Sequence, residues 1–507
     1  MRTLLINPPY PLSEIPTIPM GLAYIAAVLE RAGKEVQILD LLVSRYSREK
    51  IRDKIADYQP DIIGISAVTM NYPIATSILQ YCKMVNKNIT TVIGGPHVTF
   101  CPVETLNEAP WIDIVVRGEG EQTMLDIASR KKLDDIDGIA FRSDGIKLTS
   151  ERRFIQNLDE LPLPARHLFP LAKYQALHGH CSLITGRGCP FHCIFCAGPR
   201  MGGRKPRFRN PKLVVDEMEQ VLAYGFKEIN VQDDLLTVNH RHLRTICDEI
   251  ITRGLKFNWS AFSRVDTVNP EILRKMKDAG CTWISYGVES GNQQILDKVE
   301  KKITLEKIRY GVKLAKEAGI NVLSSFILGL PGETRETLEE TVNFAEELET
   351  LYGFHVLAPC PGTKVREKAK EYGIEILTDD WSKYDANRAV TRTVDIGPEE
   401  ISEVLRQYNE HCKLASLEQE KEGISGCSEQ VQPKERSPLA WTLVQDDVIE
   451  NLGKIKLLGD PLEGLVSRLA EILPYPYHQI NESIRKWHDE GIFQYELNDG
   501  HLIWSWG

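Results

Sequence analysis

Three cysteines stand close together in the segment GRGCPFHCIFC, residues 186–196. Cys189, Cys193 and Cys196 follow a predicted strand with the spacing C-x3-C-x2-C. Thiolates are the usual ligands of iron–sulfur clusters, and a four-iron cluster takes four ligands. Three local cysteines therefore predict a 4Fe–4S cluster in which one iron stays open to bind a small molecule.

The open iron indicates a specific chemistry. It can bind the amino and carboxylate groups of S-adenosylmethionine (SAM), and the cluster then passes one electron to the nearby sulfonium. A carbon–sulfur bond breaks and a 5′-deoxyadenosyl radical forms. The alternative is a structural zinc site with His192 or a remote cysteine as the fourth ligand. Zinc sites usually combine two separated pairs of ligands, which are not found in this sequence, so the cluster is favoured.

The composition limits the class of protein. A chain of 507 residues predicts two to four domains. Lys and Arg number 61 and Asp and Glu number 71, and the net charge of −10 argues against general binding of nucleic acid. No stretch of about 18 apolar residues and no signal peptide are found, which predicts a cytoplasmic protein without a membrane span. The odd count of 11 cysteines, three of them clustered, favours metal ligation over disulfides.

Residues 1–150 alternate short apolar runs with helical patterns, which predicts βαβ units and a doubly wound parallel sheet. The predicted strands cover residues 4–6, 36–39, 62–65, 92–93 and 114–116, and the predicted helices cover 21–31, 48–58, 73–86 and 121–129. A hairpin is expected at 139–155. Ligands bind such sheets at the carboxyl ends of the strands, so the segments 7–12, 66–69 and 94–97 are expected on one rim.

A second α/β series follows a Pro-rich connector. The connector is predicted at 151–175, and the series covers 176–392. Its strands are expected at 182–185, 228–232, 257–261, 283–287, 322–328 and 355–358. Six such units predict a partial or full β/α barrel whose active site lies at the carboxyl ends of the strands.

The C-terminal part of the sequence changes character. Residues 393–437 are expected to form a helical segment followed by a polar linker at 415–437. The tail, 438–507, shows helical patterns near 460–473 and 477–490 and ends in a hairpin with an Asp-Gly turn. These patterns predict a small winged-helix-like module, which completes an α/β protein of three parts.

The cysteine motif and its surroundings resemble the radical SAM superfamily over residues 175–390. The further matches are VQDD (231–234), AFSRVD (261–266), SYGVESG (285–291), FILGLPGET (326–334) and LAPCPGT (357–363). The resemblance implies that SAM is bound by residues at the strand ends and by the aromatic residue before the third cysteine. These residues are Phe195, Gln232, Asp233, Asp234, Arg264, Glu289, Gly329 and Leu357.

The N-terminal region resembles the cobalamin-binding domain that is fused to some radical SAM enzymes. The segments on which this resemblance depends are NPPY (7–10), residues 19–40, SAVT (66–69), GGPH (94–97) and RGEGE (117–121). The implied cobalamin contacts are Pro9, Tyr10, Ser66, Thr69, Gly94, Gly95, Pro96, His97, Gly118 and Glu119. The motif Asp-x-His-x-x-Gly, whose histidine ligates cobalt from below, is absent, which argues against such a ligand. A nucleotide-binding or purely structural sheet is the alternative.

Taken together, the chain resembles the cobalamin-dependent, class B-like radical SAM enzymes. The resemblance implies three cofactors, a 4Fe–4S cluster, SAM and cobalamin. It implies methylation of an unactivated carbon, in which the 5′-deoxyadenosyl radical activates the substrate and methylcobalamin donates the methyl group. The expected partners are a flavodoxin- or ferredoxin-like electron donor and an unidentified small-molecule, peptide or protein substrate. The alternatives are a cobalamin-dependent cyclase or rearranging enzyme and a non-catalytic protein that binds cobalamin or SAM.

Cys360 in LAPCPGT is the one further candidate for a catalytic role. Its predicted place at a strand end would let the thiol donate a hydrogen atom to a radical. A small residue packed beside a Pro turn is the simpler interpretation.

Overall fold

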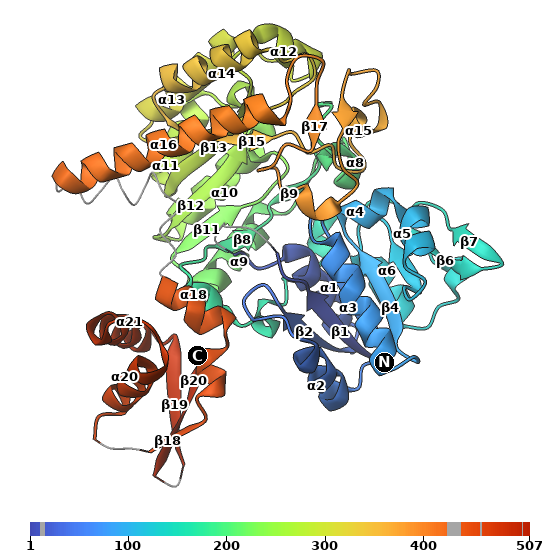
Figure 1. The fold of residues 1–507 in the computed structure, drawn as a ribbon, viewed down its shortest axis with the longest axis vertical. Coiled ribbons are helices and arrows are strands. Elements are labelled where there is room, and N and C mark those ends of the chain that lie inside the picture. The colour runs from blue at the N-terminus through green and yellow to red at the C-terminus, as the bar shows by residue number, and fades with distance from the viewer. Residues whose placement is uncertain (11–15, 423–437, 457–458, 499) are drawn as a thin grey trace.

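The protein consists of two α/β units and a small C-terminal unit (Figure 1). The computed structural model describes residues 1–10, 16–422, 438–456, 459–498 and 500–507, without the side chains of 411–422. The predicted fold class, with two successive parallel sheets, is confirmed. No helix in the described part of the chain is long and apolar enough to cross a membrane.

The N-terminal sheet has the strand order β2-β1-β3-β4-β5-β6-β7. Its strands are β1 (Arg2–Asn7), β2 (Glu35–Asp40), β3 (Ile62–Ser66), β4 (Thr90–Gly94), β5 (Ile114–Val116), β6 (Ile139–Ser143) and β7 (Gly145–Leu148). The first five are parallel, and the predicted hairpin of β6 and β7 joins them antiparallel. The strand order reverses between β1 and β3, which opens a crevice at their carboxyl ends.

Helices cover both faces of this sheet, as the alternation of apolar residues along its strands requires. Leu5 of β1 packs in the core that contains α1 (Met20–Arg31) and α6 (Glu121–Ala128). Leu4 and Ile6 face the opposite way, into the core of α2 (Arg48–Tyr58) and α3 (Tyr72–Val85). Two short helices, α4 (Pro96–Phe100) and α5 (Pro102–Glu108), follow β4 on that second face. All four predicted helices are confirmed.

The second sheet is all parallel, and its strands are adjacent in chain order, β8-β11-β12-β13-β14-β15. They are β8 (Cys181–Leu183), β11 (Glu228–Val231), β12 (Asn258–Ser263), β13 (Cys281–Glu289), β14 (Asn321–Leu328) and β15 (Leu351–Val356). The six predicted strands are confirmed, and they form an open, partial barrel. The last strand begins at Leu351, before the predicted 355, because its pairing with β14 starts there.

One helix precedes the first strand of this unit, and the others follow its strands. They are α7 (Leu171–Ala176), α8 (Gly198–Met201), α9 (Pro211–Ala223), α10 (His240–Thr252), α11 (Pro270–Asp278), α12 (Gln293–Lys298), α13 (Leu305–Glu317), α14 (Arg335–Glu347) and α15 (Lys364–Glu367). Two short antiparallel pairs complete it: β9 (Gly186–Arg187) with β10 (Arg207–Phe208), and β16 (Glu375–Ile376) with β17 (Thr391–Arg392).

The C-terminal region differs from the prediction at the expected linker. Helix α16 (Pro398–Glu422) runs through the first third of 415–437, and residues 423–437 lie outside the described part. The segment up to Glu422 is polar but has no Gly or Pro after Pro398, so its sequence permits a helix as far as Glu422.

The C-terminal unit contains the two predicted helices and the predicted hairpin. Its elements are α18 (Pro438–Gln445), α19 (Val448–Asn451), α20 (Pro461–Ile472), α21 (Tyr477–Asp489), β18 (Lys454–Lys456), β19 (Phe493–Asn498) and β20 (His501–Trp506). The helices α18 and α19 and the strand β18 were not predicted. Asp447 fixes the unit to the rest of the chain, where it accepts from buried Lys173 of α7 at 2.9 Å. The resemblance of this unit to a winged helix stays a prediction.

Buried charges join the two α/β units. Arg166 in the connector is fully buried and donates to the Glu217 carboxylate of α9 at 2.6 Å and to the Ser182 carbonyl at 2.6 Å. Arg209 donates to the other oxygen of Glu217 and to the Tyr24 hydroxyl of α1 at 3.2 Å. One buried carboxylate therefore neutralises two guanidinium groups at the boundary between the units.

The change Glu217→Ala tests this boundary. It leaves two guanidinium groups buried without their counter-charge, which is expected to lower the free energy of unfolding by about 3–5 kcal/mol. Urea denaturation followed by circular dichroism measures it. The matched control is Glu219→Ala on the same helix, whose partner Arg253 lies at the surface, and little change is expected there. Equal denaturation of both variants would contradict the role of Glu217.

Candidate functional site: a cysteine loop beside a glycine-edged pocket

The three cysteines lie on one loop, residues 188–206, which is closed at its base by the pairing of β9 with β10. The base is also held by hydrogen bonds of the main chain. Gly188 N donates to an Asp234 carboxylate oxygen at 2.6 Å, and Cys189 N donates to the Gly203 carbonyl at 3.0 Å. Gly188 has φ +102°, a conformation that favours glycine, so the sharp turn before Cys189 depends on this residue.

The donor set fits an iron–sulfur cluster. Cys189, Cys193 and Cys196 are free thiols. Burial raises the pKa of the Cys196 thiol to about 11, so a bound metal must supply the charge that keeps it a thiolate. Among the described residues, no group of three or more His, Cys, Asp or Glu side chains is arranged to hold a single metal ion. A four-iron cluster needs no such arrangement, because each cysteine binds a different iron.

Arg264, predicted at the end of the third barrel strand, contacts the cysteine loop. Its Nη1 lies 3.8 Å from the Cys193 sulfur, and its guanidinium carbon lies 3.7 Å from the centre of the Phe191 ring. The same side chain donates to Asp266 at 2.9 and 3.0 Å and to the Lys301 carbonyl at 2.8 Å. These contacts fix a positive charge beside the cysteine loop.

Glu289 and Lys301 form a buried ion pair of 2.6 Å near the same place. Glu289 ends β13 with φ +72°, where the pairing with β14 shifts register. This unusual backbone turns the carboxylate back along the strand, over Gly287. Lys301 was not predicted, because its position in the loop after α12 offers no sequence pattern that would have singled it out.

The polar residues after β11, at positions 232–234, differ in their contacts. Asp233 accepts from Thr185 N at 2.6 Å, from Gly186 N at 3.2 Å and from the Thr185 hydroxyl. Its carboxylate thus shapes the turn between β8 and β9. Gln232 and Asp234 line the pocket described below. The assignment of these residues to SAM stays a prediction.

An apolar wall adjoins the loop on the other side. Leu357 packs with Ile194 and Leu330, and Phe195 packs against the same group. Gly329 begins the turn above this wall with φ +84°. Glu333, which was not predicted, holds the turn by accepting from Gly329 N at 2.5 Å and Leu330 N at 3.1 Å, and burial raises the pKa of its carboxyl to about 8.

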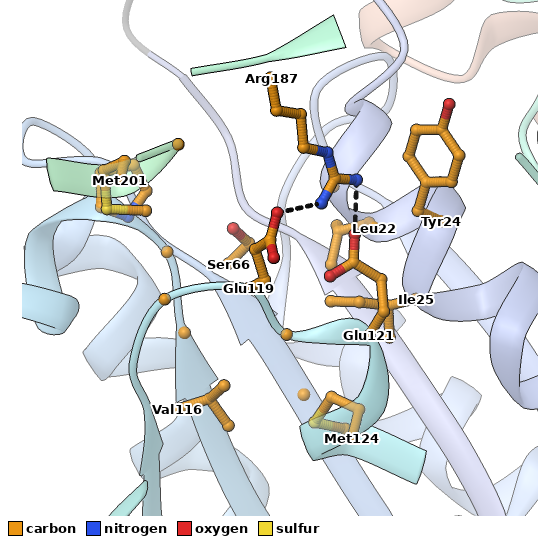
Figure 2. Close-up of a pocket in the computed structure, with 18 of the residues that line it drawn as sticks. Leu22, Tyr24, Ile25, Ser66, Val116, Glu119, Glu121, Met124, Arg187 and Met201 are labelled. Atoms are coloured by element: carbon orange, nitrogen blue, oxygen red, sulfur yellow. Dashed lines mark hydrogen bonds and ion pairs between the residues drawn. The ribbon is translucent and has the colours of Figure 1, made fainter. Parts of the chain in front are cut away.

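A pocket of about 320 Å³ lies at the carboxyl ends of the N-terminal strands and reaches the cysteine loop (Figure 2). Its floor is apolar, with Leu5 and Met124 among the lining residues. Its other wall comes from the barrel unit and includes Arg187, Met201 and Asp234. A volume of this size is typical of small-molecule and cofactor sites.

Six of the residues predicted to bind cobalamin line this pocket: Ser66, Gly94, Gly95, Pro96, Gly118 and Glu119. One of the glycines is required by packing within the chain, and another leaves room in the pocket. A Cβ atom on Gly95 would lie 2.5 Å from the Ala67 carbonyl oxygen. Gly94 lies on the same face of β4 as Val92, and both line the pocket, so a larger side chain at Gly94 would enter the space that a bulky cofactor needs. The residues present therefore fit cobalamin.

The remaining four, Pro9, Tyr10, Thr69 and His97, do not line the pocket. His97 is buried, stacks on Tyr72 with ring centroids 4.2 Å apart, and meets the edge of Trp381 at 4.8 Å. Its Nδ1 lies 3.4 Å from the Thr69 hydroxyl. Burial lowers the pKa of His97 to about 4, so the ring is neutral. No histidine is among the described residues that line the pocket.

Cys360 lies in this same region rather than at the cysteine loop. Its thiol lies near Thr69, and burial raises the pKa of the thiol. The segment 357–363 therefore meets the N-terminal unit at Thr69. A catalytic role of the thiol stays a prediction.

Glu119 lines the pocket, but its carboxylate is not free to accept from a cofactor amide. It accepts from Arg187 Nη1 at 2.8 Å, from Arg207 Nη2 at 2.9 Å and from Ile155 N at 2.7 Å. Arg187 also donates to Glu121 at 2.6 Å (Figure 2). Arg187, Arg207 and Glu121 were not predicted, although Arg187 stands beside the cysteine motif, between Gly186 and Gly188.

Each of the two α/β units matches the profile of a known protein family. The profile of the radical SAM superfamily matches residues 183–345, and that of the B12 binding domain matches residues 13–128. An uncharacterized methyltransferase from Pyrococcus horikoshii is 37% identical over 421 residues, which cover 80% of this chain and 91% of that protein. An anaerobic magnesium-protoporphyrin IX monomethyl ester cyclase from Cereibacter sphaeroides is 32% identical over 72% of this chain and 62% of that protein.

A solved structure has the same fold. The radical SAM methyltransferase TsrM from Kitasatospora setae, with cobalamin and a [4Fe-4S] cluster bound, matches with a TM-score of 0.66 and 18% identity. The match covers 96% of this chain and 99% of that one. At this identity the likeness concerns the fold, which extends over all but a small part of both chains.

Replacing the three cysteines tests the cluster site. The variant Cys189→Ala/Cys193→Ala/Cys196→Ala is expected to lose all cluster iron, because no other described thiol lies on this loop. Metal analysis after anaerobic reconstitution measures this, and Cys247→Ala, a buried thiol in α10, is the control that keeps its iron. Zinc without iron in the unmodified protein would contradict the cluster.

Filling the pocket tests the cobalamin site. The variant Gly94→Leu is expected to lower the affinity for cobalamin about ten-fold or more, because its side chain takes space from the cofactor. Gly94→Ala is the control, since its added Cβ makes only ordinary contacts with Val116, at 3.6 Å. Titration with hydroxocobalamin measures both affinities. An unchanged affinity of the leucine variant would place the cofactor elsewhere.

Proposed function

Because the chain belongs to the cobalamin-dependent radical SAM enzymes, we propose that it methylates an unactivated carbon atom of its substrate. The family establishes the cofactors, which are a 4Fe–4S cluster, SAM and cobalamin. The observation that carries the proposal is the shared pocket: the rim that fits cobalamin and the base of the cysteine loop form its two walls. A methyl carrier and a radical source would thereby act in one space. The name of the Pyrococcus horikoshii relative, a methyltransferase, supports the same reaction.

We propose that the residues around the cysteine loop bind the cluster and SAM. Cys189, Cys193 and Cys196 would hold three irons, and the fourth would bind SAM. The Glu289–Lys301 pair and Arg264, all fixed near the loop, offer charged groups to the amino acid part of SAM. The wall that includes Phe195 and Leu357 offers an apolar surface to the adenine and excludes water from the radical.

When bound, the cluster supplies the electron that splits SAM into methionine and a 5′-deoxyadenosyl radical, and cobalamin carries the methyl group. Each methylation consumes two SAM molecules, one as the methyl donor and one as the source of the radical. The products are S-adenosylhomocysteine from the first and methionine with 5′-deoxyadenosine from the second. Two electrons are needed for each product, and we propose a flavodoxin- or ferredoxin-like donor for them. The substrate is a small molecule or a peptide or protein side chain in this proposal.

The second candidate function is ring formation without methyl transfer. The similarity to the cyclase from Cereibacter sphaeroides favours it. The two reactions differ in the fate of SAM, because a cyclase would form 5′-deoxyadenosine and no S-adenosylhomocysteine.

The products formed without any substrate distinguish the two functions. The holoenzyme is incubated anaerobically with titanium citrate and SAM, and the products are quantified by mass spectrometry. A methyltransferase is expected to form about one S-adenosylhomocysteine per bound cobalamin, because the carrier is loaded before the substrate is needed. The control is Gly94→Leu without cobalamin, which should form 5′-deoxyadenosine alone. Absence of S-adenosylhomocysteine from the holoenzyme would refute methyl transfer.

A further inference from the structure

The loop that carries the cysteines begins and ends at two arginines that face each other. Arg187 of β9 and Arg207 of β10 are partners in the antiparallel pairing, one just before Cys189 and the other at the end of the loop. Each guanidinium lies near an aromatic ring, Arg187 above Tyr24 at 5.3 Å and Arg207 above Phe154 at 5.0 Å. The two strands of the loop base therefore present a pair of positive charges to the N-terminal unit.

A single carboxylate of the N-terminal unit receives both charges. Glu119 follows β5 and accepts from Arg187 Nη1 at 2.8 Å and Arg207 Nη2 at 2.9 Å through the same oxygen. Its second oxygen accepts from Arg207 Nη1 at 3.2 Å and from Ile155 N at 2.7 Å. Glu119 thus bridges the two ends of the loop and the start of the connector.

The bridge is buried, so salt screens it weakly. The side chains of Glu119 and Arg207 are 8% and 6% exposed, and that of Arg187 is 15% exposed. Within the described structure, Glu119 is the carboxylate that pairs with Arg207, whereas Arg187 has a second partner in Glu121. Loss of Glu119 therefore removes the carboxylate partner of Arg207, which keeps its hydrogen bonds to the Ile155 and Gly202 carbonyls, and leaves Arg187 paired with Glu121.

Part of this ion-paired network forms the wall of the pocket. Glu119, Glu121 and Arg187 all line it, and Figure 2 shows the two ion pairs crossing its edge. Gly202, whose carbonyl accepts from Arg207 at 2.8 Å, lines it as well. A molecule in the pocket thus lies against the bridge that sets the position of the cysteine loop.

We propose that Glu119 is a positioning residue that couples occupation of the cobalamin pocket to the placement of the cluster loop. The physical basis is that the pocket wall and the loop base share one ion-paired network. Because such coupling is reciprocal, the bound cluster must change the affinity for cobalamin by the same factor by which cobalamin changes the binding of the cluster. The inference rests on the cofactors of the family and goes beyond the proposed reaction, since it does not depend on methyl transfer.

The experiment measures the dissociation constant of hydroxocobalamin for the full chain, once without the cluster and once after anaerobic reconstitution. The unmodified protein is expected to show a difference of about five-fold or more. In Glu119→Gln the ratio should fall to about one, because the amide loses the charge that holds Arg207. The control is Glu121→Gln, which leaves the bridge to both arginines intact and should keep the ratio of the unmodified protein. No substrate is present, so the result is independent of the products formed from SAM.

A spectroscopic readout observes the cluster directly. The electron paramagnetic resonance spectrum of the reduced cluster should shift when cobalamin is added to the unmodified protein and to Glu121→Gln, and should not shift in Glu119→Gln. If Glu119→Gln does not fold, Arg207→Gln cuts the same bridge from the loop side and is read in the same way. Any of three results would overturn the proposal. The ratio of the two dissociation constants could be one in the unmodified protein, unchanged in the Glu119 variant, or reduced to one in the Glu121 control.

Discussion

In the proposed site, three ligands from one short loop would hold a cluster from one side, and the open side would face a second cofactor. This requirement explains why so many hydrogen bonds converge on the base of the loop. Asp233 and Asp234 accept from main-chain donors just before Cys189, where an unpaired amide would be costly. The antiparallel pairing of β9 with β10 closes the loop. The cysteines can then lie on an irregular backbone without losing their position.

The same arrangement of ion pairs occurs twice at the boundary between the two α/β units. Glu217 and Glu119 are each buried and each receive two arginines. Both sites lie where polar loop segments from the two units meet, so apolar packing alone would leave charges or amides without partners. Paired charges in a dry boundary have strict geometry, which makes the relative position of the two units well defined. A fixed distance between two cofactors, one bound by each unit, would depend on such a boundary.

The pocket is lined by some, but not all, of the residues that the family resemblance implied as cobalamin contacts. Gly94, the last residue of β4, and Gly95, which follows it, both line the pocket. His97, only two residues beyond Gly95, turns away because α4 begins at Pro96 and carries the ring against Tyr72. Trp381 covers it from the other unit. The neutral, enclosed histidine therefore belongs to the packing between the units, and the pocket is bordered by glycines and arginine–glutamate pairs instead.

The sequence by itself determined the two α/β series, the positions of their strands along the chain and the chemistry of the cysteine motif. These features arise from short-range patterns, since apolar alternation and ligand spacing are visible within a few residues. Only the tertiary structure decided that Glu119 pairs with Arg207 and that Thr69 meets Cys360, because these partners are far apart in the chain. It also decided that α16 continues through a polar segment, where composition alone suggested a linker. Long-range pairing depends on how two units pack together, which no local pattern encodes.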